Sequence, residues 1–317
     1  MRKTTALIAA IALLGGLTAC SGGTASRTAG CDPAVLPGKA SAVVTASGAL
    51  GSAPTVGFPT PLYTKTTQAS TIIAGTGAPI TAGQPVILDV TILNGADATP
   101  LKKTSYAATG GSLITAGKST FPAISEGLEC AKVGSRIAIV GSAKDSHAAA
   151  ADPANGISKS DSFVYVVDVK DAFLAKANGA DQIPVNGMPA VVLTADGTPG
   201  ISVPDRAAPK TSAVNVLKKG SGATVKSNQF LVVKFTAIGW SSRIVFDSTW
   251  TDHQASVLQV GAASVSTGLS RALIGQRVGS QILAVLPPRA AAVADGSGKA
   301  PADDAAVYVV DILGIAG

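Results

Sequence analysis

The residue types that usually carry covalent or metal chemistry are few in this chain of 317 residues. Its two histidines, His147 and His253, have no cysteine near them and lack the spacing of metal ligands. Spacing alone does not exclude a Ser-His-Asp triad, but the sequence contains no G-x-S-x-G turn, which holds the nucleophile in one class of such enzymes. Gly75–Gly77 and Gly220–Gly222 precede predicted strands, and no Lys-Ser/Thr follows them as in a phosphate-binding loop. The sequence therefore predicts no metal and no cofactor.

The other residues that could form a site are aromatic and lie near the C-terminus. Phe235, Phe246 and Tyr308 stand in apolar segments, and Asp247 directly follows Phe246. Aromatic residues on strands are most often core residues, so these alone do not define a site. Strand-like patterns predict that they are positioned by three strands within Gln229–Trp240, Ile244–Trp250 and Ala306–Ile315.

The order of elements in Gln229–Gly317 is more specific than any single motif. A strand, the Phe-Asp pair, a short helix at Leu269–Ile274, a Val-Gly turn, a strand that ends at Pro287–Pro288 and an aromatic final strand follow one another. Over about ninety residues this order resembles an FKBP-type peptidyl-prolyl cis-trans isomerase domain. The resemblance implies an α+β fold: a twisted antiparallel β-sheet wrapped around one short α-helix, with the active pocket between them.

The resemblance also implies the site residues. Those that match the family's pocket are Phe235, Phe246, Asp247, Val265, Ser266, Leu269 and Tyr308. Phe235 replaces a tyrosine, Leu269 replaces the tryptophan of the pocket floor, and Ser266 replaces an isoleucine of which only the backbone N–H is needed. Ala292 falls near the position of a loop tyrosine that binds the ligand. The smaller floor and the missing donor predict weak catalysis and low affinity for macrolide inhibitors.

The chain contains an internal repeat. Gly75-Thr76-Gly77 matches Gly220-Ser221-Gly222, and Val133-Gly134-Ser135 matches Val278-Gly279-Ser280, both at an offset of 145 residues. The segment Val164–Asp168 matches Val307–Asp311 at an offset of 143. Such self-similarity indicates a duplicated domain.

The repeat sets the expected domain boundaries. We expect two tandem FKBP-like domains at 68–174 and 212–317, joined by a Pro-rich linker at 175–211. Within the linker, Ala190–Leu193 is a candidate short strand or a segment that docks on a domain. Residues 20–67 have the composition of a tether and extended lead-in.

The first copy has lost most of the implied pocket residues. Leu101 and Lys102 stand at the Phe-Asp position, Val90 replaces an aromatic residue, and Ile124 falls at the floor. Only Tyr165 remains as a pocket aromatic. We therefore interpret residues 68–174 as a structural or binding copy without activity.

The first nineteen residues have the pattern of a bacterial lipoprotein signal peptide. Arg2 and Lys3 precede an apolar run that is too short to span a bilayer, and Leu17-Thr18-Ala19-Cys20 resembles a lipobox. An ordinary signal peptide with an incidental cysteine is the alternative. The lipobox predicts lipidation of Cys20, cleavage before it and a membrane anchor on the extracytoplasmic face.

Two cysteines remain after Cys20. An even pair in an exported protein favours a disulfide between Cys31 and Cys130, and two free buried thiols are the alternative. The net charge of +6 falls to +4 when Arg2 and Lys3 are removed with the leader, and no basic cluster indicates nucleic-acid binding. The Ala-rich composition is typical of a high-GC bacterium such as an actinobacterium.

Two functions remain in competition. The first is a lipid-anchored, monomeric isomerase that assists the folding of secreted proteins through residues 212–317 and binds proline-containing peptides or unfolded exported chains. The second is a catalytically weak or inactive FKBP-like lipoprotein that binds peptides or acts as a scaffold. The Phe-Asp motif and Tyr308 favour the first, while Leu269 and Ala292 favour the second.

Overall fold

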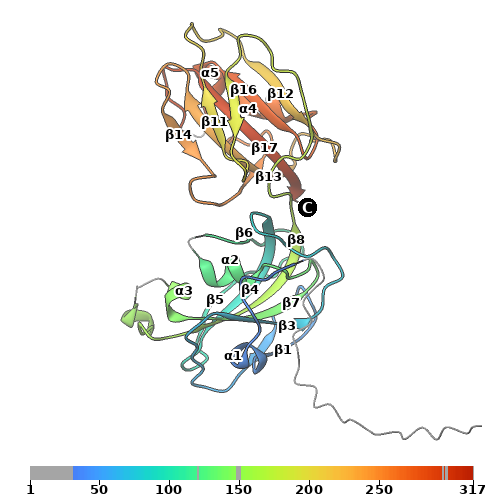
Figure 1. Cartoon of the computed structure of the whole chain (residues 1–317). Helices are drawn as coiled ribbons and strands as arrows, with labels where there is room; N and C mark the ends of the chain where they lie inside the picture. Colours follow the sequence, from blue (N-terminus) through green and yellow to red (C-terminus); the bar gives the residue numbers. More distant parts are fainter. Residues whose placement is uncertain (1–30, 120, 148–150, 295, 297–298, 317) are drawn as a thin grey trace, which may run out of the picture.

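The computed structural model describes residues 31–119, 121–147, 151–294, 296 and 299–316, in two sheet-rich units that follow one another along the chain (Figure 1). The predicted leader and Cys20 lie outside these residues. Within the described part of the chain, no helix is long and apolar enough to cross a membrane.

The C-terminal unit is an antiparallel sheet with two short helices. Its strands are β9 (Ala180–Asp181), β12 (Ala213–Lys219), β13 (Phe230–Gly239), β14 (Val245–Ser248), β15 (Ser256–Gln259), β16 (Gln281–Leu286) and β17 (Ala306–Ala316). The order is β14-β13-β17-β16-β12-β9, and β15 also pairs with β13. The helices are α4 (Thr267–Leu273) and α5 (Pro288–Ala291). The short helix and the Pro-terminated strand therefore form where the sequence predicts them.

The N-terminal unit repeats this topology. Its sheet contains β3 (Gln68–Ile73), β4 (Pro85–Asn94), β5 (Pro100–Lys103), β6 (Ser112–Thr115), β7 (Arg136–Gly141) and β8 (Phe163–Ala172). The order β3-β7-β8-β4-β5, with β6 also on β4, matches β12-β16-β17-β13-β14 with β15 on β13. Its helices are α2 (Pro122–Gly127), α3 (Ala143–His147) and the 3₁₀ turn Pro153–Asn155. The topology thus agrees with the duplication that the sequence indicates.

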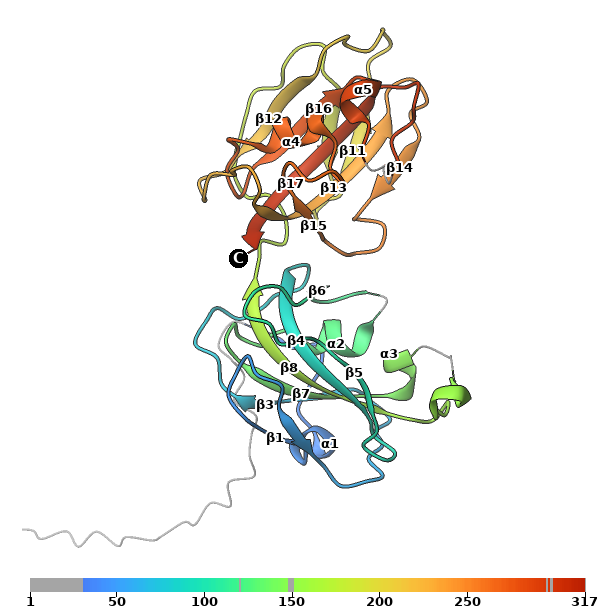
Figure 2. The same ribbon diagram turned by 180° about the vertical axis from the view of Figure 1, so that it is seen from behind.

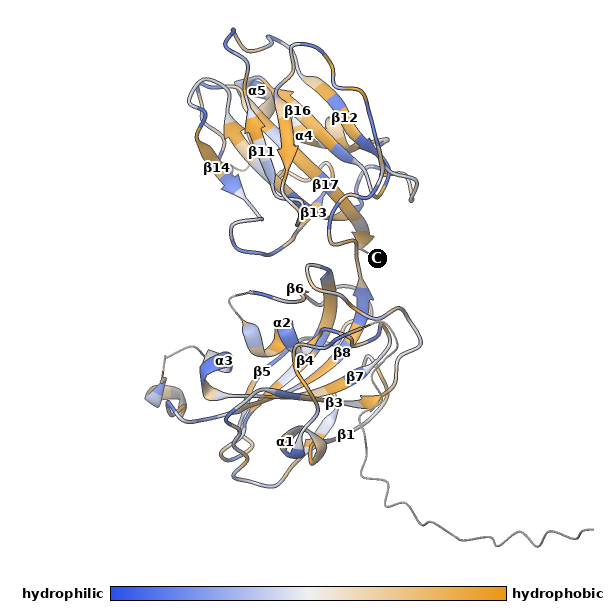
Figure 3. Cartoon of the chain, in the orientation of Figure 1, coloured by the Kyte–Doolittle hydropathy of each residue, from blue (hydrophilic) through white to orange (hydrophobic). Residues whose placement is uncertain are grey.

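Each sheet is apolar on both faces, because successive side chains along its central strands point in turn into two buried apolar clusters, one on each face. In the C-terminal unit, Leu231, Ala237 and Tyr308 face α4, while Val307 and Val309 pack on the opposite face. The orange strands β16 and β17 in Figure 3 show this apolar character. A sheet that is buried on both faces needs a second covering layer.

The second layer comes from the segments expected to be linker and lead-in. Strands β10 (Ala190–Leu193) and β11 (Pro199–Ser202) form a hairpin whose residues Val191, Ile201 and Val203 pack on the outer face of the C-terminal sheet. The prolines of this segment shape turns and edge strands, so a Pro-rich composition does not make it an open linker.

The N-terminal unit has an equivalent hairpin, β1 (Thr45–Ser47) with β2 (Thr55–Gly57), which follows helix α1 (Lys39–Ala42). Residues Val44, Val56 and Leu62 pack on its sheet. The strand pairs Thr45 with Gly57 and Ala190 with Ser202 lie 145 residues apart. The repeated unit therefore includes the hairpins and is longer than the two expected domains, and part of the predicted tether is an ordered element.

A disulfide ties the start of the described chain to the N-terminal unit. Cys31 and Cys130 are bonded, with their Cα atoms 5.7 Å apart and a sequence separation of 99. The bond fixes the lead-in beside the segment that follows α2.

The two units contact each other through a small interface. Ile87 and Phe173 pack against Val232 and Leu313, and Lys234 donates hydrogen bonds to the carbonyl oxygens of Gly83 (3.0 Å) and Ala175 (3.1 Å). At the same junction the N–H of Ala255, just before β15, donates to Oγ1 of Thr115, at the end of β6 (3.2 Å). Figure 2 shows β15 and β6 facing each other across the junction.

Candidate active site

A pocket of about 470 Å³ opens on the inner face of the C-terminal sheet, between the strands and the start of α4. The structure brings together at this pocket all seven residues that the resemblance implies: Phe235, Phe246, Asp247, Val265, Ser266, Leu269 and Tyr308. They are contributed by β13, β14, α4, the loop before α4, and β17.

Three neighbouring strands position the aromatic wall. Tyr308 on β17 pairs with Ala237 on β13, two residues beyond Phe235, so both side chains point to the inner face. The ring centres of Phe246 and Tyr308 are 5.9 Å apart with planes at 84°, which is an edge-to-face contact. The centres of Phe235 and Tyr308 are 6.4 Å apart. The Tyr308 ring therefore lies between the other two.

Burial and charge keep the Tyr308 hydroxyl protonated. Burial, as the larger cause, and the nearby negative charge of Asp247 together raise its pKa to about 12. At neutral pH the hydroxyl is thus a neutral hydrogen-bond donor at the wall of an apolar pocket.

The loop before α4 contributes a backbone donor. The side chain of Ser266 caps the helix, because its Oγ accepts a hydrogen bond from the N–H of Leu269 (3.2 Å). Among the described residues, no atom accepts a hydrogen bond from the N–H of Ser266 itself, although this residue is almost fully buried. A buried N–H group without a partner is rare, and here it belongs to a residue that lines the pocket.

The carboxylate of Asp247 is engaged at the pocket mouth. Lys299 Nζ lies 2.9 Å from Asp247 Oδ1, and both side chains retain solvent contact. The hydrogen bond and the charge of Asp247 raise the pKa of Lys299. The acidic residue therefore forms part of an exposed ion pair.

Sequence reasoning missed one wall of the pocket. The further lining residues are Phe230, Ser256, Val257, Leu258, Gln259, Ala262, Ser264, Val293 and Lys299. Four of them form β15, a strand too short to give a clear alternation. The loop after α5 reaches the pocket with Val293, whereas Ala292, at the expected tyrosine position, is exposed and lies outside the lining.

The N-terminal unit has a smaller pocket in the equivalent place. Its volume is about 310 Å³, and the residues expected at the altered positions all line it: Val90, Leu101, Lys102, Ile124 and Tyr165. Burial raises the pKa of Tyr165 to about 12. Three aromatic residues line this pocket, Phe121, Phe163 and Tyr165, so the expectation that Tyr165 is its only aromatic residue is wrong.

Comparison with known proteins agrees with this geometry. The family model described as FKBP-type peptidyl-prolyl cis-trans isomerase matches residues 222–313. A relative from Corynebacterium glutamicum, described as a probable FK506-binding protein, is 25% identical over 115 residues, which are 36% of this chain and 96% of the relative.

Two solved structures that resemble parts of the chain are from wheat and from Escherichia coli. The three FKBP domains of wheat FKBP73 are 16% identical, with a TM-score of 0.33 over 78% of this chain and 94% of the other. FkpA from Escherichia coli is 20% identical, with a TM-score of 0.31 over 42% of this chain and 53% of the other. The family model matches the residues that build the larger pocket, so the C-terminal unit is similar to FKBP-type peptidyl-prolyl cis-trans isomerase domains.

Proposed function

We propose that the chain is a lipid-anchored peptidyl-prolyl cis-trans isomerase that acts on exported proteins through the pocket of its C-terminal unit. One observation supports this most strongly: a single pocket combines an aromatic wall with the unpartnered N–H of Ser266. Such a site can hold a peptide by its backbone while an apolar surface surrounds the prolyl ring.

The proposed reaction needs no nucleophile and no proton transfer. Rotation about an X–Pro bond crosses a barrier of about 18–20 kcal/mol, because amide resonance is lost on twisting. The twisted imide is less polar at its carbonyl than the planar form. A dry pocket lined by Phe235, Phe246 and Tyr308 therefore binds the twisted form better than the planar one, and this difference lowers the barrier.

The side chains divide this work. The three aromatic rings and Val265 enclose the proline, the N–H of Ser266 binds a carbonyl oxygen of the substrate, and Leu269 forms the floor. Asp247 and Lys299 form a charged pair at the mouth that orients the peptide. Leu269 covers less of the floor than an aromatic residue would, so we expect a slow enzyme.

The direct test is a protease-free proline isomerisation assay on residues 21–317 and on a Phe246→Ala, Asp247→Ala double variant. We expect acceleration by the parent chain and at least about a tenfold loss in the variant, because the edge-to-face contact and most of one wall disappear. A parent chain that is folded by circular dichroism yet gives the uncatalysed rate would overturn the proposal.

A second pair of variants isolates the backbone donor. Ser266 has φ of −57°, a value that proline adopts, so Ser266→Pro removes the N–H at a compatible backbone angle. Ser266→Ala removes the same helix cap and keeps the N–H. We expect about tenfold lower kcat/KM for the proline variant than for the alanine variant, the size of one hydrogen bond made in the transition state. Equal rates for the two variants would show that this N–H does not bind substrate.

A peptide-binding protein without turnover is the second candidate. The observation that favours it is Leu269 at the pocket floor, together with the reduced pocket of the N-terminal unit. Under this alternative, proline peptides perturb the pocket in a binding experiment while the isomerisation rate stays uncatalysed.

The location follows from the sequence before residue 31. We propose that Cys20 is lipidated and that the described units lie on the extracytoplasmic face of a bacterial membrane, held by the ten residues between Cys20 and the disulfide at Cys31. In a bacterial host, we expect the parent chain in the membrane fraction and a Cys20→Ser variant outside it. Equal fractionation of the two would contradict the anchor.

A further inference from the structure

We infer that the pocket of the N-terminal unit is a non-catalytic peptide site that takes a bulky apolar side chain with a carboxylate next to it. This inference goes beyond the proposed function, which rests on the C-terminal pocket alone. The family model does not extend to the residues of this pocket.

The pocket has an apolar wall that is open to solvent. Branched aliphatic residues from β4, β5 and β6 form one side, and Ile124 of α2 and Tyr165 of β8 form its base. Phe121, at the start of α2, also lines the pocket and is 58% exposed. A hollow of about 310 Å³ with an exposed aromatic residue on its lining is suited to an apolar side chain from another molecule.

The backbone donor needed for the proposed catalysis is occupied here. Phe121 stands 145 residues before Ser266, at the equivalent place before the short helix. Its N–H donates a hydrogen bond to Oγ of Ser119 (3.0 Å), and this Oγ is in turn bonded to Ser125 Oγ (3.0 Å). The N–H of Phe121 thus already has an acceptor, whereas the equivalent N–H of Ser266 has none among the described residues, so the backbone donor of the proposed catalysis is not free here.

The ion pair of the C-terminal pocket has no counterpart in the N-terminal one. Lys102 stands at the position of Asp247, and both Ala154 and Gly156, at offsets of 145 and 143 residues from Lys299, are uncharged. Lys102 is exposed, and no acidic side chain of the described residues lies within ion-pair distance of it. The C-terminal pocket mouth holds its two charges in an ion pair, whereas the positive charge of Lys102 has no ion-pair partner among the described residues.

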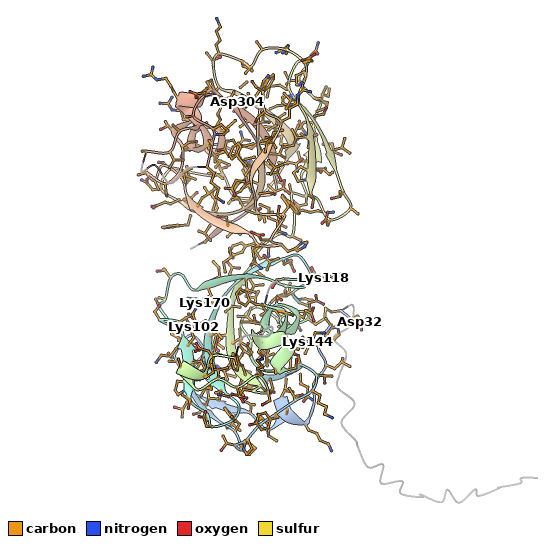
Figure 4. The ribbon with its side chains drawn as sticks, turned by 90° about the vertical axis from the view of Figure 1, so that its left-hand side faces the viewer. Asp32, Lys102, Lys118, Lys144, Lys170 and Asp304 are labelled. Atoms are coloured by element: carbon orange, nitrogen blue, oxygen red, sulfur yellow. A yellow bond between two sulfur atoms is a disulfide. The ribbon has the colours of Figure 1, made fainter. Side chains whose placement is uncertain are left out.

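Lys102 is the lysine that lines the pocket. Figure 4 shows Lys118 and Lys144 on the other side of the N-terminal unit from Lys102 in this view. Asp145 also lines the pocket, but its carboxylate accepts hydrogen bonds from the hydroxyls of Thr67 (2.6 Å) and Ser142 (2.7 Å). Lys102 is therefore the charge that is free to meet a ligand, and it selects a carboxylate beside the apolar anchor.

The test uses residues 21–317 with isotope-labelled isoleucine, leucine and valine methyl groups, observed by NMR. The methyl groups of Ile114 and Ile124 report on this pocket. The methyl groups of Val257, Leu258 and Leu269 report on the C-terminal pocket. The probe is the proline-free peptide acetyl-Gly-Glu-Phe-Leu-Glu-Gly-amide, and its control has lysine in place of both glutamates. We expect the acidic peptide to shift both isoleucine methyl signals, and the basic peptide to bind at least about fivefold more weakly, the size of an exposed charge contact.

Two variants with the same change in net charge sharpen the test. Lys102→Glu reverses the charge at the pocket, while Lys39→Glu reverses one on α1, whose neighbours pack on the opposite face of the sheet. We expect at least about fivefold weaker binding of the acidic peptide for Lys102→Glu and unchanged binding for Lys39→Glu. Leu101→Phe, which fills the pocket with a larger side chain, should also weaken binding without altering the charge.

The outcomes separate this inference from the proposed function. Equal binding of both peptides, or shifts confined to residues of the C-terminal pocket, would overturn the inference and leave the isomerisation assay unaffected. Isomerisation by the Lys102→Glu variant at the parent rate, together with its loss of peptide binding, would support a separate site. A chain without isomerase activity that still binds the acidic peptide would reject the proposed function alone.

Discussion

A chain that begins at residue 212 is expected to unfold at a much lower denaturant concentration than one that begins at residue 176. The shorter chain lacks the hairpin β10–β11, so Trp240, Val285 and Val307 on the outer sheet face become exposed to water. Each large apolar side chain that loses its burial costs about 1.5–3 kcal/mol. The sum is on the order of 5 kcal/mol or more, which is comparable with the whole stability of a domain.

The removed segment also satisfies polar groups. The indole N–H of Trp240 donates to the carbonyl oxygen of Arg206 (2.8 Å), and the N–H of Ala177 donates to the buried carboxylate of Asp311 (2.8 Å). Guanidinium titrations followed by tryptophan fluorescence measure the difference between the two chains. Equal midpoints for the two chains would show that the hairpin contributes nothing to the sheet it covers. As the control, the chain from residue 176 should unfold at the same midpoint as the C-terminal unit within residues 21–317.

Replacement of Arg136 by alanine is expected to destabilise the N-terminal unit by about 3–5 kcal/mol, the usual cost of breaking a buried ion pair. Arg136 is fully buried and holds the carboxylate of Asp168 through two nitrogen atoms, each 2.6 Å from an oxygen. Its guanidinium also donates to carbonyl oxygens of Gly48, Ala49 and Ser52 in the β1–β2 loop. Without it, Asp168 is left as a buried charge with no ion-pair partner, although the N–H of Gly51 still donates to it (2.7 Å), and the β1–β2 loop loses three hydrogen bonds.

The C-terminal unit supplies a matched control for this prediction. Gln281 occupies the position of Arg136 and donates to Asp311 Oδ1 (2.7 Å). An Arg136→Gln variant can keep one hydrogen bond to Asp168 and should lose less stability than Arg136→Ala. Thermal unfolding of both variants checks the order, and the reverse order would show that the carboxylate does not depend on a hydrogen-bonding partner at this position.

The larger pocket could be predicted because the order of elements resembles a known family, and its aromatic residues lie in a fixed register on regular strands. Phe246 and Tyr308 are close in space since antiparallel pairing with β13 sets their positions. The ion pair of Asp247 with Lys299 could not be predicted, because it depends on how a loop 52 residues later returns to the sheet.

Of the covering hairpins, the sequence predicted strand β10 at Ala190–Leu193, while its partner β11 and the hairpin β1–β2 were missed for a different reason. Their strands are only three or four residues long, and each contributes few buried side chains, such as Val56 and Ile201. Periodicity is weak over so short a length, and frequent prolines resemble a linker. Comparison of the two copies at an offset of 145 residues would have shown that Pro54 and Pro59 recur as Pro199 and Pro204.

The contact between Thr115 and Ala255 joins β6 to the segment that leads into β15, and each of these strands lines one pocket. Because the units meet there, a client held at the N-terminal pocket would keep the rest of its chain within a small volume around the C-terminal pocket. Engagement of the second pocket then depends on an effective concentration, which is in the millimolar range for a short flexible connection and falls as the connection lengthens. The spacing between an acidic apolar anchor and a proline in the client would therefore decide which prolyl bonds are reached most often.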